Sequence, residues 1–263
     1  MTRHTFALCA YRESPFLEEC IRSLLAQTEK SEILVATSTP SPFLTEICER
    51  YSLPLFVNPG EGGISNDWTF AVSCVKTPFF TIAHQDDVYE PTYTEEVLTR
   101  LSHARRPILA FTDYFEIRRG ERVYQNRLLR VKRFLALPIR LFPHSRFARR
   151  RALSLGNCIC CPAVTYAREA FGDMAFDPAY AFVCDWDATE RLSRLRGSFF
   201  FIRRPLMGHR IHEDSETSRL SASKRREEEE KELLGRFWPR PIARLLFRFY
   251  RHGADSNELT KDK

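Results

Sequence analysis

The stretch TIAHQDDVYEP, residues 81–91, ends an apolar, β-branched run with two adjacent carboxylates, Asp86 and Asp87. The run predicts a buried strand over residues 79–83, and Pro91 indicates a turn before the helical pattern that follows. Two carboxylates at the end of a buried strand repel each other unless a cation lies between them. The stretch therefore predicts a site for a hard divalent cation, with an ordinary turn or helix cap as the alternative.

Strand and helix patterns alternate on either side of this stretch. Strand-like segments, each separated from the next by a helical pattern, are found at 5–10, 32–36, 53–57, 79–83 and 108–112. Such alternation with short connections predicts an α/β fold, in which helices cover both faces of a mostly parallel twisted sheet. Ligands of these sheets bind beyond the carboxyl ends of the strands. The loops expected at that edge span residues 11–13, 37–40 and 84–87.

After residue 114 the pattern changes to a basic segment. Residues 118–151 contain twelve Lys or Arg and a single acidic residue, Glu121. Apolar residues at helical spacing predict one or two amphipathic helices, broken at Pro138 and Pro143, in a basic helical insertion at 118–155.

The rest of the chain returns to alternating patterns and ends in two charged helices. An apolar strand-like segment, an acidic-start helix, a strand, a polar loop and the two C-terminal helices are predicted at 156–166, 184–195, 197–203, 208–218, 223–234 and 241–251. We expect one domain over residues 1–218, followed by an appendage over 219–263 with a frayed tail from 257.

The composition is that of a globular protein, with 263 residues, 43% hydrophobic and 28% charged, and a net charge of +6. No apolar run approaches the roughly 20 residues of a membrane span, and the N-terminus leads into a strand pattern rather than a secretory signal. The eight cysteines are scattered, so we expect a reducing cytosol. The cluster Cys158, Cys160 and Cys161 lies in an apolar run, which favours buried thiols over a zinc site.

Positive charge is concentrated in the basic insertion and in the last helix, over 241–251. An apolar face beside a row of arginines in that helix is formed by Ile242, Leu245, Leu246 and Phe249. The pattern predicts contact with an anionic membrane surface, and packing of the helix on its own domain is the open alternative. The sequence carries no recognisable nucleic-acid-binding motif, so nucleic acid is not an expected partner.

The order of these segments resembles that of family 2 glycosyltransferases with the GT-A fold. The matching segments are AYRE (10–13), LLAQT (24–28), the strand at 32–36, Asp86-Asp87, Asp185-Trp186 and His212 within RIHEDSET (210–217). The resemblance covers residues 4–218. It implies transfer of a sugar from a nucleotide-diphosphate sugar to an acceptor, with Mn²⁺ or Mg²⁺ as cofactor and inversion at the anomeric carbon.

This resemblance implies a nucleotide site at the ends of the first two strands. It places Tyr11 and Glu13 at the nucleoside, and Asn66 follows a Gly-rich loop where it could touch the nucleotide or sugar. The family's paired Asp residues that read the base after the second strand are Thr37 and Ser38 here. Hydroxyls can hydrogen-bond a base or ribose, so both residues are expected at the nucleotide, whose base the departure leaves open.

The resemblance also implies a metal site. It puts Asp86 on the metal with Asp87 as its neighbour, in contact with metal and donor, and it puts His212 near the diphosphate or metal. The first Asp of the family's metal loop is His84 here, which leaves one carboxylate fewer. For His212, the alternative is an ordinary surface residue.

Asp185 matches the family's catalytic base at the start of a late helix. The alternative is a carboxylate that interacts with the helix dipole, which fits Asp187 equally well. A base is needed because the acceptor hydroxyl has a very high pKa.

Together these features predict a cytoplasmic, metal-dependent, inverting glycosyltransferase, peripheral on the inner face of the membrane. Its acceptor would be a lipid-linked or surface glycan, as in polysaccharide and cell-envelope biosynthesis. The departures at residues 37–38 and 84 motivate the alternative of a non-catalytic nucleotide-sugar-binding homologue, and a membrane-surface adaptor is a second alternative. An enzyme that joins a nucleotide to a sugar phosphate would carry a Gly-rich basic signature, which residues 9–14 lack.

Overall fold

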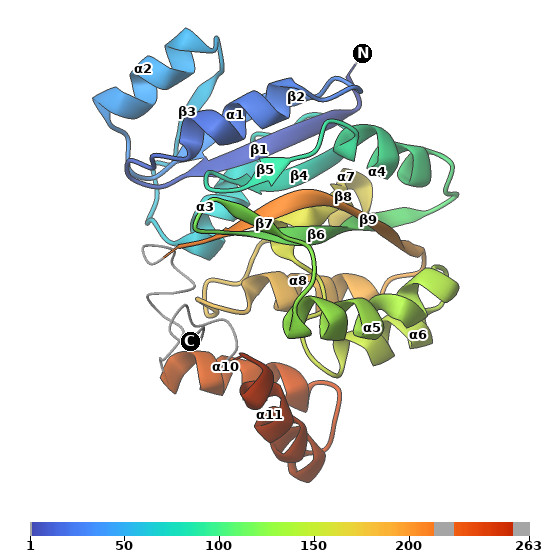
Figure 1. The fold of residues 1–263 in the computed structure, drawn as a ribbon. Coiled ribbons are helices and arrows are strands. Elements are labelled where there is room, and N and C mark those ends of the chain that lie inside the picture. Colours follow the sequence, from blue (N-terminus) through green and yellow to red (C-terminus); the bar gives the residue numbers. More distant parts are fainter. Residues whose placement is uncertain (1, 213–223, 255–263) are drawn as a thin grey trace.

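The computed structural model describes residues 2–212 and 224–254. Its first part alternates strand and helix as predicted, through β1 (His4–Ala10), α1 (Leu17–Leu25), β2 (Glu32–Thr37), α2 (Pro42–Arg50), β3 (Leu55–Val57), α3 (Ile64–Ser73), β4 (Phe79–His84), β5 (Val88–Tyr89), α4 (Tyr93–Ser102) and β6 (Pro107–Arg118). The remainder (Figure 1) contains β7 (Glu121–Val123), α5 (Arg127–Leu141), α6 (Arg146–Leu153), the 3₁₀ turn η1 (Cys161–Ala163), β8 (Val164–Ala167), α7 (Arg168–Phe171), α8 (Cys184–Ser193), β9 (Ser198–Ile211), α10 (Lys224–Gly235) and α11 (Arg240–Ala254).

The strands form one sheet in the order β3-β2-β1-β4-β8-β6-β9-β5, and β7 pairs with β6. The pairs β3–β2, β2–β1, β1–β4 and β6–β9 are parallel, whereas β8 runs antiparallel to both β4 and β6. One reversed strand therefore joins two parallel units. This arrangement confirms the predicted α/β fold with a mostly parallel sheet.

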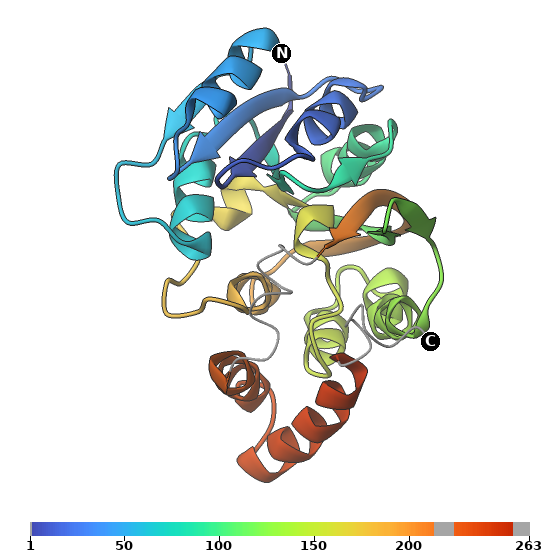
Figure 2. The same cartoon turned by 60° about the vertical axis from the view of Figure 1, so that its left-hand side comes forward.

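Alternate residues of the central strands enter two different cores, one on each face of the sheet. On β1, Phe6 and Leu8 pack with α1 and α4, while Ala7 between them belongs to the other core, because successive side chains of a strand point to opposite faces. The second core includes residues of α3, α5, α6, α8 and α10. Helices therefore cover both faces of the sheet, as the two views in Figures 1 and 2 show.

The C-terminal helices pack on this second core. Leu233 and Leu234 of α10 are fully buried in it, and α11 contributes Ala243 and Phe247. Ile242 and Leu245, predicted on the apolar face of the last helix, are 43% and 54% exposed. None of the described helices combines the length and apolar character that crossing a bilayer requires. The Phe249 side chain, the predicted boundary at 218/219 and the predicted tail lie outside the described residues.

The end of β9 differs from the prediction. Residues 208–211, predicted as part of a polar loop, extend the strand because they pair with β6 as far as Arg118↔Ile211. A Cβ on Gly208 would lie 2.6 Å from the ring of Phe115, so only glycine lets the two strands approach this closely. The extension carries the following residues to the sheet edge that the sequence predicts for the site.

The basic insertion is helical, but one predicted detail in it and one directly after it are wrong. Helix α5 continues through Pro138 and ends at Leu141. A proline inside a helix frees the carbonyl four residues earlier, here that of Phe134, a residue that is 73% exposed. The apolar segment 156–166 contributes only part of β8, because η1 precedes that strand.

The cysteines all have free thiols. Burial raises the pKa of the thiols in the cluster, that of Cys158 to about 12 and those of Cys160 and Cys161 well above their usual value. A raised pKa keeps these groups as neutral thiols, whereas zinc binds thiolates. This environment therefore agrees with the prediction of buried thiols. Across residues 2–212 and 224–254, no group of three side chains of metal-ligating type is preformed.

Candidate active site

The Asp86 carboxylate contacts both the loop after β1 and the residue that follows β9. Its Oδ1 accepts a hydrogen bond from the Ser14 hydroxyl at 2.8 Å, and its Oδ2 lies 3.1 Å from Nε2 of His212. Asp86 follows β4, Ser14 follows β1, and His212 follows β9. The parallel strands bring these ends to one edge of the sheet, so the predicted pair Asp86 and His212 is in contact.

Asp87 is almost completely buried, at 1% exposure. Its Oδ1 accepts hydrogen bonds from the backbone N–H of Arg210 at 2.9 Å and from His209 Nδ1 at 3.1 Å, whereas its Oδ2 has no hydrogen-bond partner among the described residues. Burial alone would raise the pKa of Asp87, but the His209 imidazole and the Arg210 amide bring it below its usual value. The site therefore holds an ionised carboxylate with one unpaired oxygen.

Arg210, near the end of β9, contacts both the loop after β4 and helix α1. Its guanidinium donates through Nε to the carbonyl of Asp86 at 2.8 Å and through Nη2 to Glu19 at 2.6 Å, and it lies 4.3 Å from the ring centre of Phe16. These contacts hold the end of β9 against the loop after β4 and the helix after β1. They support the positions of Asp86 and His212.

The donor atoms at this edge suit a divalent ion. Asp86 and His212 present a carboxylate and an imidazole, and the unpaired Oδ2 of Asp87 lies in the same loop. Mg²⁺ and related ions commonly take one or two carboxylates and complete their shell with water and substrate phosphates. The residues present thus fit an ion of which the protein supplies only part of the coordination shell.

His84 occupies the space between these carboxylates and α8. Its ring stacks on Trp68 at 5.2 Å between ring centres, and Nδ1 lies 3.7 Å from Asp87 Oδ2. Burial lowers the pKa of His84, while the charges of Asp87, Asp86 and Asp185 oppose that change. The charges of all three carboxylates act on His84, so Asp185 shares an electrostatic environment with the Asp86-Asp87 pair.

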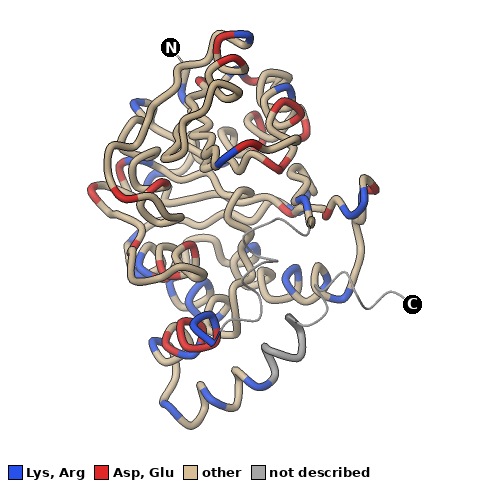
Figure 3. Tube along the Cα trace, turned by 90° about the vertical axis from the view of Figure 1, so that its left-hand side faces the viewer, with Lys and Arg blue, Asp and Glu red and all other residues tan. Residues whose placement is uncertain are grey.

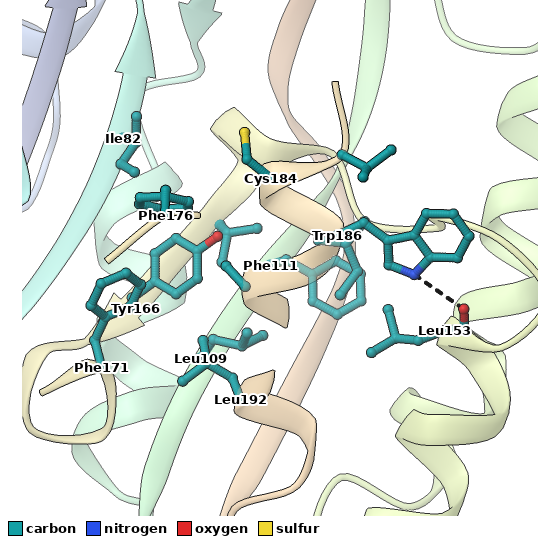
Figure 4. Packing of buried hydrophobic residues seen from close by; sticks show 14 of the residues in the cluster. Ile82, Leu109, Phe111, Leu153, Tyr166, Phe171, Phe176, Cys184, Trp186 and Leu192 are labelled. Atoms are coloured by element: carbon teal, nitrogen blue, oxygen red, sulfur yellow. Dashed lines mark hydrogen bonds between the residues drawn. The ribbon is translucent and has the colours of Figure 1, made fainter. Parts of the chain in front are cut away.

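Asp185 lies in the first turn of α8. Its Oδ2 accepts from the Asn157 amide at 2.8 Å and its Oδ1 from the backbone N–H of Trp186 at 2.7 Å. Burial raises the pKa of Asp185 despite these hydrogen bonds. The Trp186 indole, 1% exposed, fixes the helix by donating to the carbonyl of Leu153 at 3.2 Å, as Figure 4 shows.

Asp187, the alternative to Asp185, has a structural role. Its carboxylate is 2% exposed and pairs with Arg191 at 2.8 Å and with Arg236, directly after α10, at 2.6 Å. Both oxygens of this buried carboxylate are occupied by guanidinium groups. Asp185 therefore remains the candidate base.

Lys132 is a site residue that sequence reasoning missed. Its Nζ lies 5.3 Å from the ring centre of Tyr114, and its charge opposes the rise that burial causes in the pKa of that phenol. The pKa values of Asp185 and His209 are both raised overall. The positive charge of Lys132 acts in the opposite direction and makes each rise smaller. One signal was available, because Lys132 is the single lysine of a segment in which every other basic residue is arginine.

The loops after β1 and β2 form the predicted nucleotide end. Tyr11 is 39% exposed, and its backbone N–H and carbonyl are held by the side chain of Gln85 at 3.1 and 2.9 Å. Thr37 is buried, and its hydroxyl accepts from the backbone N–H of Thr39 at 3.0 Å. Tyr11 can therefore contact a ligand, whereas Thr37 shapes the loop.

Ser38 is hydrogen-bonded to a carboxylate that follows the Gly-rich loop, next to Asn66. Its hydroxyl donates to Asp67 of α3 at 2.8 Å, and Asp67 also accepts from the Asn58 amide at 2.9 Å. Asp67 thus brings a carboxylate to the end of β2, where this chain has hydroxyls. Glu13 is exposed and Asn66 is half-buried at the same edge.

Comparison with known proteins reveals a family. The chain matches the profile of glycosyl transferase family 2 over residues 5–174, more than half of its length. No curated protein sequence matches the chain.

Solved structures share the fold at low sequence identity. The chain is similar to the mannosyltransferase PcManGT from Pyrobaculum calidifontis in complex with GDP-Man and Mn²⁺, with a TM-score of 0.66 and 12% identity over 97% of this chain and 73% of that one. It is also similar to residues 1–349 of S. aureus TarS in complex with UDP-GlcNAc, with a TM-score of 0.60 and 13% identity over 98% and 74% of the chains. Glucosyl-3-phosphoglycerate synthase from Mycobacterium tuberculosis gives 0.57 and 15% over 89% and 80%. The profile match over most of the sheet, together with this fold, shows that the chain belongs to glycosyl transferase family 2 and is a glycosyltransferase with the GT-A fold.

Proposed function

We propose that the protein transfers a sugar from a nucleotide-diphosphate sugar to an acceptor hydroxyl, with inversion and with Asp185 as the base. The observation that supports this proposal is that the charges of Asp185 and of the Asp86-Asp87 pair all act on the buried His84 imidazole. A proton acceptor and a cation-binding pair at one site are what a direct displacement at an anomeric carbon requires.

Asp185 has the environment of a base. Burial raises the pKa of its carboxyl, so the carboxylate accepts a proton more readily than an ordinary aspartate does. As the acceptor oxygen bonds to the anomeric carbon, the bond to the diphosphate breaks and the acceptor proton passes to Asp185. Asn157 and the α8 backbone keep the carboxylate aimed during this step.

Asp86 and His212 would hold Mn²⁺ or Mg²⁺, with Asp87 beside them. When bound, such an ion neutralises charge that develops on the leaving diphosphate. Ser14 orients Asp86, and His209 and Arg210 orient Asp87. Removal of such supporting partners typically weakens metal affinity or activity about 10- to 100-fold.

The donor would lie along the loops after β1 and β2. We assign the nucleoside to the neighbourhood of Tyr11, Glu13 and Ser38, and Asn66 to the nucleotide or sugar. The complexes of PcManGT with GDP-Man and of TarS with UDP-GlcNAc support a nucleotide-sugar donor. Asp67, held by Ser38, adds a carboxylate that can accept from a base or ribose N–H or O–H.

The acceptor would be a glycan or lipid-linked sugar at the cytoplasmic, inner face of a membrane. The support is the basic insertion next to the site, which carries no acidic residue from 122 to 168. Such a surface is attracted to anionic lipid.

Thermal shift of the purified protein with Mn²⁺ and a panel of UDP, GDP, dTDP and CDP sugars tests the proposal. A ligand at 100 times its dissociation constant adds about 2.7 kcal/mol, or roughly 5–10 °C for a chain of this size. We expect the melting temperature to rise with one nucleotide sugar only when the metal is present. Asp86→Ala should remove this rise, whereas Asp173→Ala, a control at an exposed position, should keep it. Binding without donor hydrolysis or transfer would favour the non-catalytic homologue, motivated by His84 in place of a carboxylate.

A further inference from the structure

Helices α5 and α6 expose an apolar surface that is unusual for a protein free in water. The exposed fractions of Phe134 and Phe147 are 73% and 72%, and those of Leu141 and Phe142 are 60% and 61%. We define the α5–α6 face as the exposed apolar residues Val131, Phe134, Leu137, Leu141, Phe142 and Phe147. Contiguous apolar surface of this kind usually marks an interaction site.

The α5–α6 face is presented by a well-anchored helix. The opposite side of α5 is buried through Leu129, Ala136 and Ile139. Arg133 ties the helix to the sheet by donating to Asp113 at 2.7 Å and to the carbonyl of Tyr124 at 2.8 Å. The exposed side chains are therefore a fixed feature of the folded protein.

Unpaired positive charge surrounds these apolar side chains. Arg127, Arg130 and Arg140 are exposed on α5, and among the described residues none of them pairs with a carboxylate. From residue 122 to 168 the sequence has eleven Lys or Arg and no Asp or Glu. Figure 3 shows the same imbalance along the chain that leads from the β6–β7 hairpin into α5, and again along α11.

We propose that the α5–α6 face docks on an anionic phospholipid bilayer, with the apolar side chains in the interface and the arginines on lipid phosphates. This inference deepens the membrane association proposed above and does not depend on the transfer reaction. A bilayer accounts for both halves of the surface, since its anionic headgroups attract arginine and its acyl boundary takes up phenylalanine and leucine. Nucleic acid would engage the arginines but would leave the phenylalanines in water.

Docking by this face would bring the catalytic site close to the lipid surface. Lys132 of α5 lies 5.3 Å from the ring centre of Tyr114, and its positive charge acts on the Asp185 carboxyl. A single helix thus separates the proposed lipid contact from the candidate base. An acceptor embedded in the bilayer by a lipid tail would need only a short reach to Asp185.

Co-sedimentation with vesicles of phosphatidylcholine, with and without phosphatidylglycerol, tests the proposal. We expect binding that requires the anionic lipid and weakens as salt is raised. The variant Arg127→Gln/Arg130→Gln/Arg140→Gln should bind about a hundredfold more weakly. The variant Phe134→Ser/Phe142→Ser/Phe147→Ser should lose binding even though its charge is unchanged.

Matched controls alter the same residue types elsewhere. Arg100→Gln/Arg105→Gln/Arg106→Gln removes equal charge near the end of α4, and Leu25→Ser/Phe56→Ser/Val57→Ser removes exposed apolar side chains of α1 and β3. Both controls should bind like the unaltered protein. Equal losses in controls and test variants, or no binding to either vesicle, would overturn the proposal.

Two further readouts separate the possible failures. Hydrolysis of a soluble donor in the absence of lipid should be unchanged in the α5–α6 variants, so vesicle binding without any turnover would leave docking intact and refute the proposed function instead. Light scattering should show the same mass for the unaltered protein and the phenylalanine variant. A dimer that this variant dissociates would identify the face as an interface between two copies, and membrane docking would be wrong.

Discussion

The imidazole Nε2 of His212 lies 3.1 Å from Oδ2 of Asp86, although 126 residues separate the two in the chain. The contact depends on β9, which pairs with β6 along its length and with β5 through Val88↔Gly208. Because β5 starts directly after Asp87, that pairing fixes the last residues of β9 beside the loop that carries Asp86. Two atoms of ligand type are thus preset by strand pairing.

Loss of His212 should weaken metal binding. In His212→Ala we expect the Mn²⁺ concentration for half-maximal donor hydrolysis to rise at least about tenfold, because one ligand of the preset pair is lost. A Mn²⁺ titration of activity, with free Mn²⁺ followed by electron paramagnetic resonance, measures this. The control is His103→Ala, which removes an exposed histidine directly after the C-terminal end of α4. An unchanged Mn²⁺ requirement in His212→Ala would remove His212 from the site.

Loss of the base should stop transfer without affecting donor binding. We expect Asp185→Asn to lower kcat about 10²- to 10⁴-fold while the donor-induced thermal shift persists. In the unaltered protein the rate should rise with pH through the pKa of Asp185, because only the carboxylate accepts a proton. Burial raises that pKa, so the acidic limb should lie above the roughly 3.9 of an ordinary aspartate. An acidic limb that persists in Asp185→Asn would point to another base.

Lys132 should tune this base. Its positive charge favours the ionised form of Asp185 and so lowers the pKa of that carboxyl. Removing the charge in Lys132→Met should shift the acidic limb of the pH–rate profile to higher pH, and Lys132→Arg should restore it. A purely structural lysine would change the melting temperature of the variant without moving the limb.

Arg236 should stabilise the fold through buried carboxylates of α8. It pairs with Asp187 at 2.6 Å and lies 3.8 Å from Glu190, whose side chains are 2% and 0% exposed. Arg236→Met would leave negative charge buried with fewer partners, so we expect a loss of about 3–5 kcal/mol in the free energy of unfolding. Urea denaturation measures it. Arg204→Met, which breaks the more exposed ion pair with Glu96, is the matched control. It should lower the free energy of unfolding by less than about 1 kcal/mol. Equal costs would contradict the role assigned to burial.

Local patterns in the sequence were enough to predict the elements and the edge that carries the site. The period of two in strands and the helical spacing between them set the alternating α/β order. The Asp86-Asp87 pair after β4 predicted a cation site, the family resemblance predicted Asp185 as the base, and the imbalance of charge predicted the basic insertion. Each of these signals lies within a window of a few residues.

Tertiary structure decided how those pieces meet. Pairing of β6 with β9 turned a predicted polar loop into strand and brought His209 and His212 to the carboxylates, and packing directed α11 inward through Ala243 and Phe247. Contacts between residues about a hundred positions apart depend on shape and pairing across the whole chain, which no local window contains. For the same reason, the sequence predicted that Lys132 lies in a basic helix, but only the fold showed that its charge acts on Asp185.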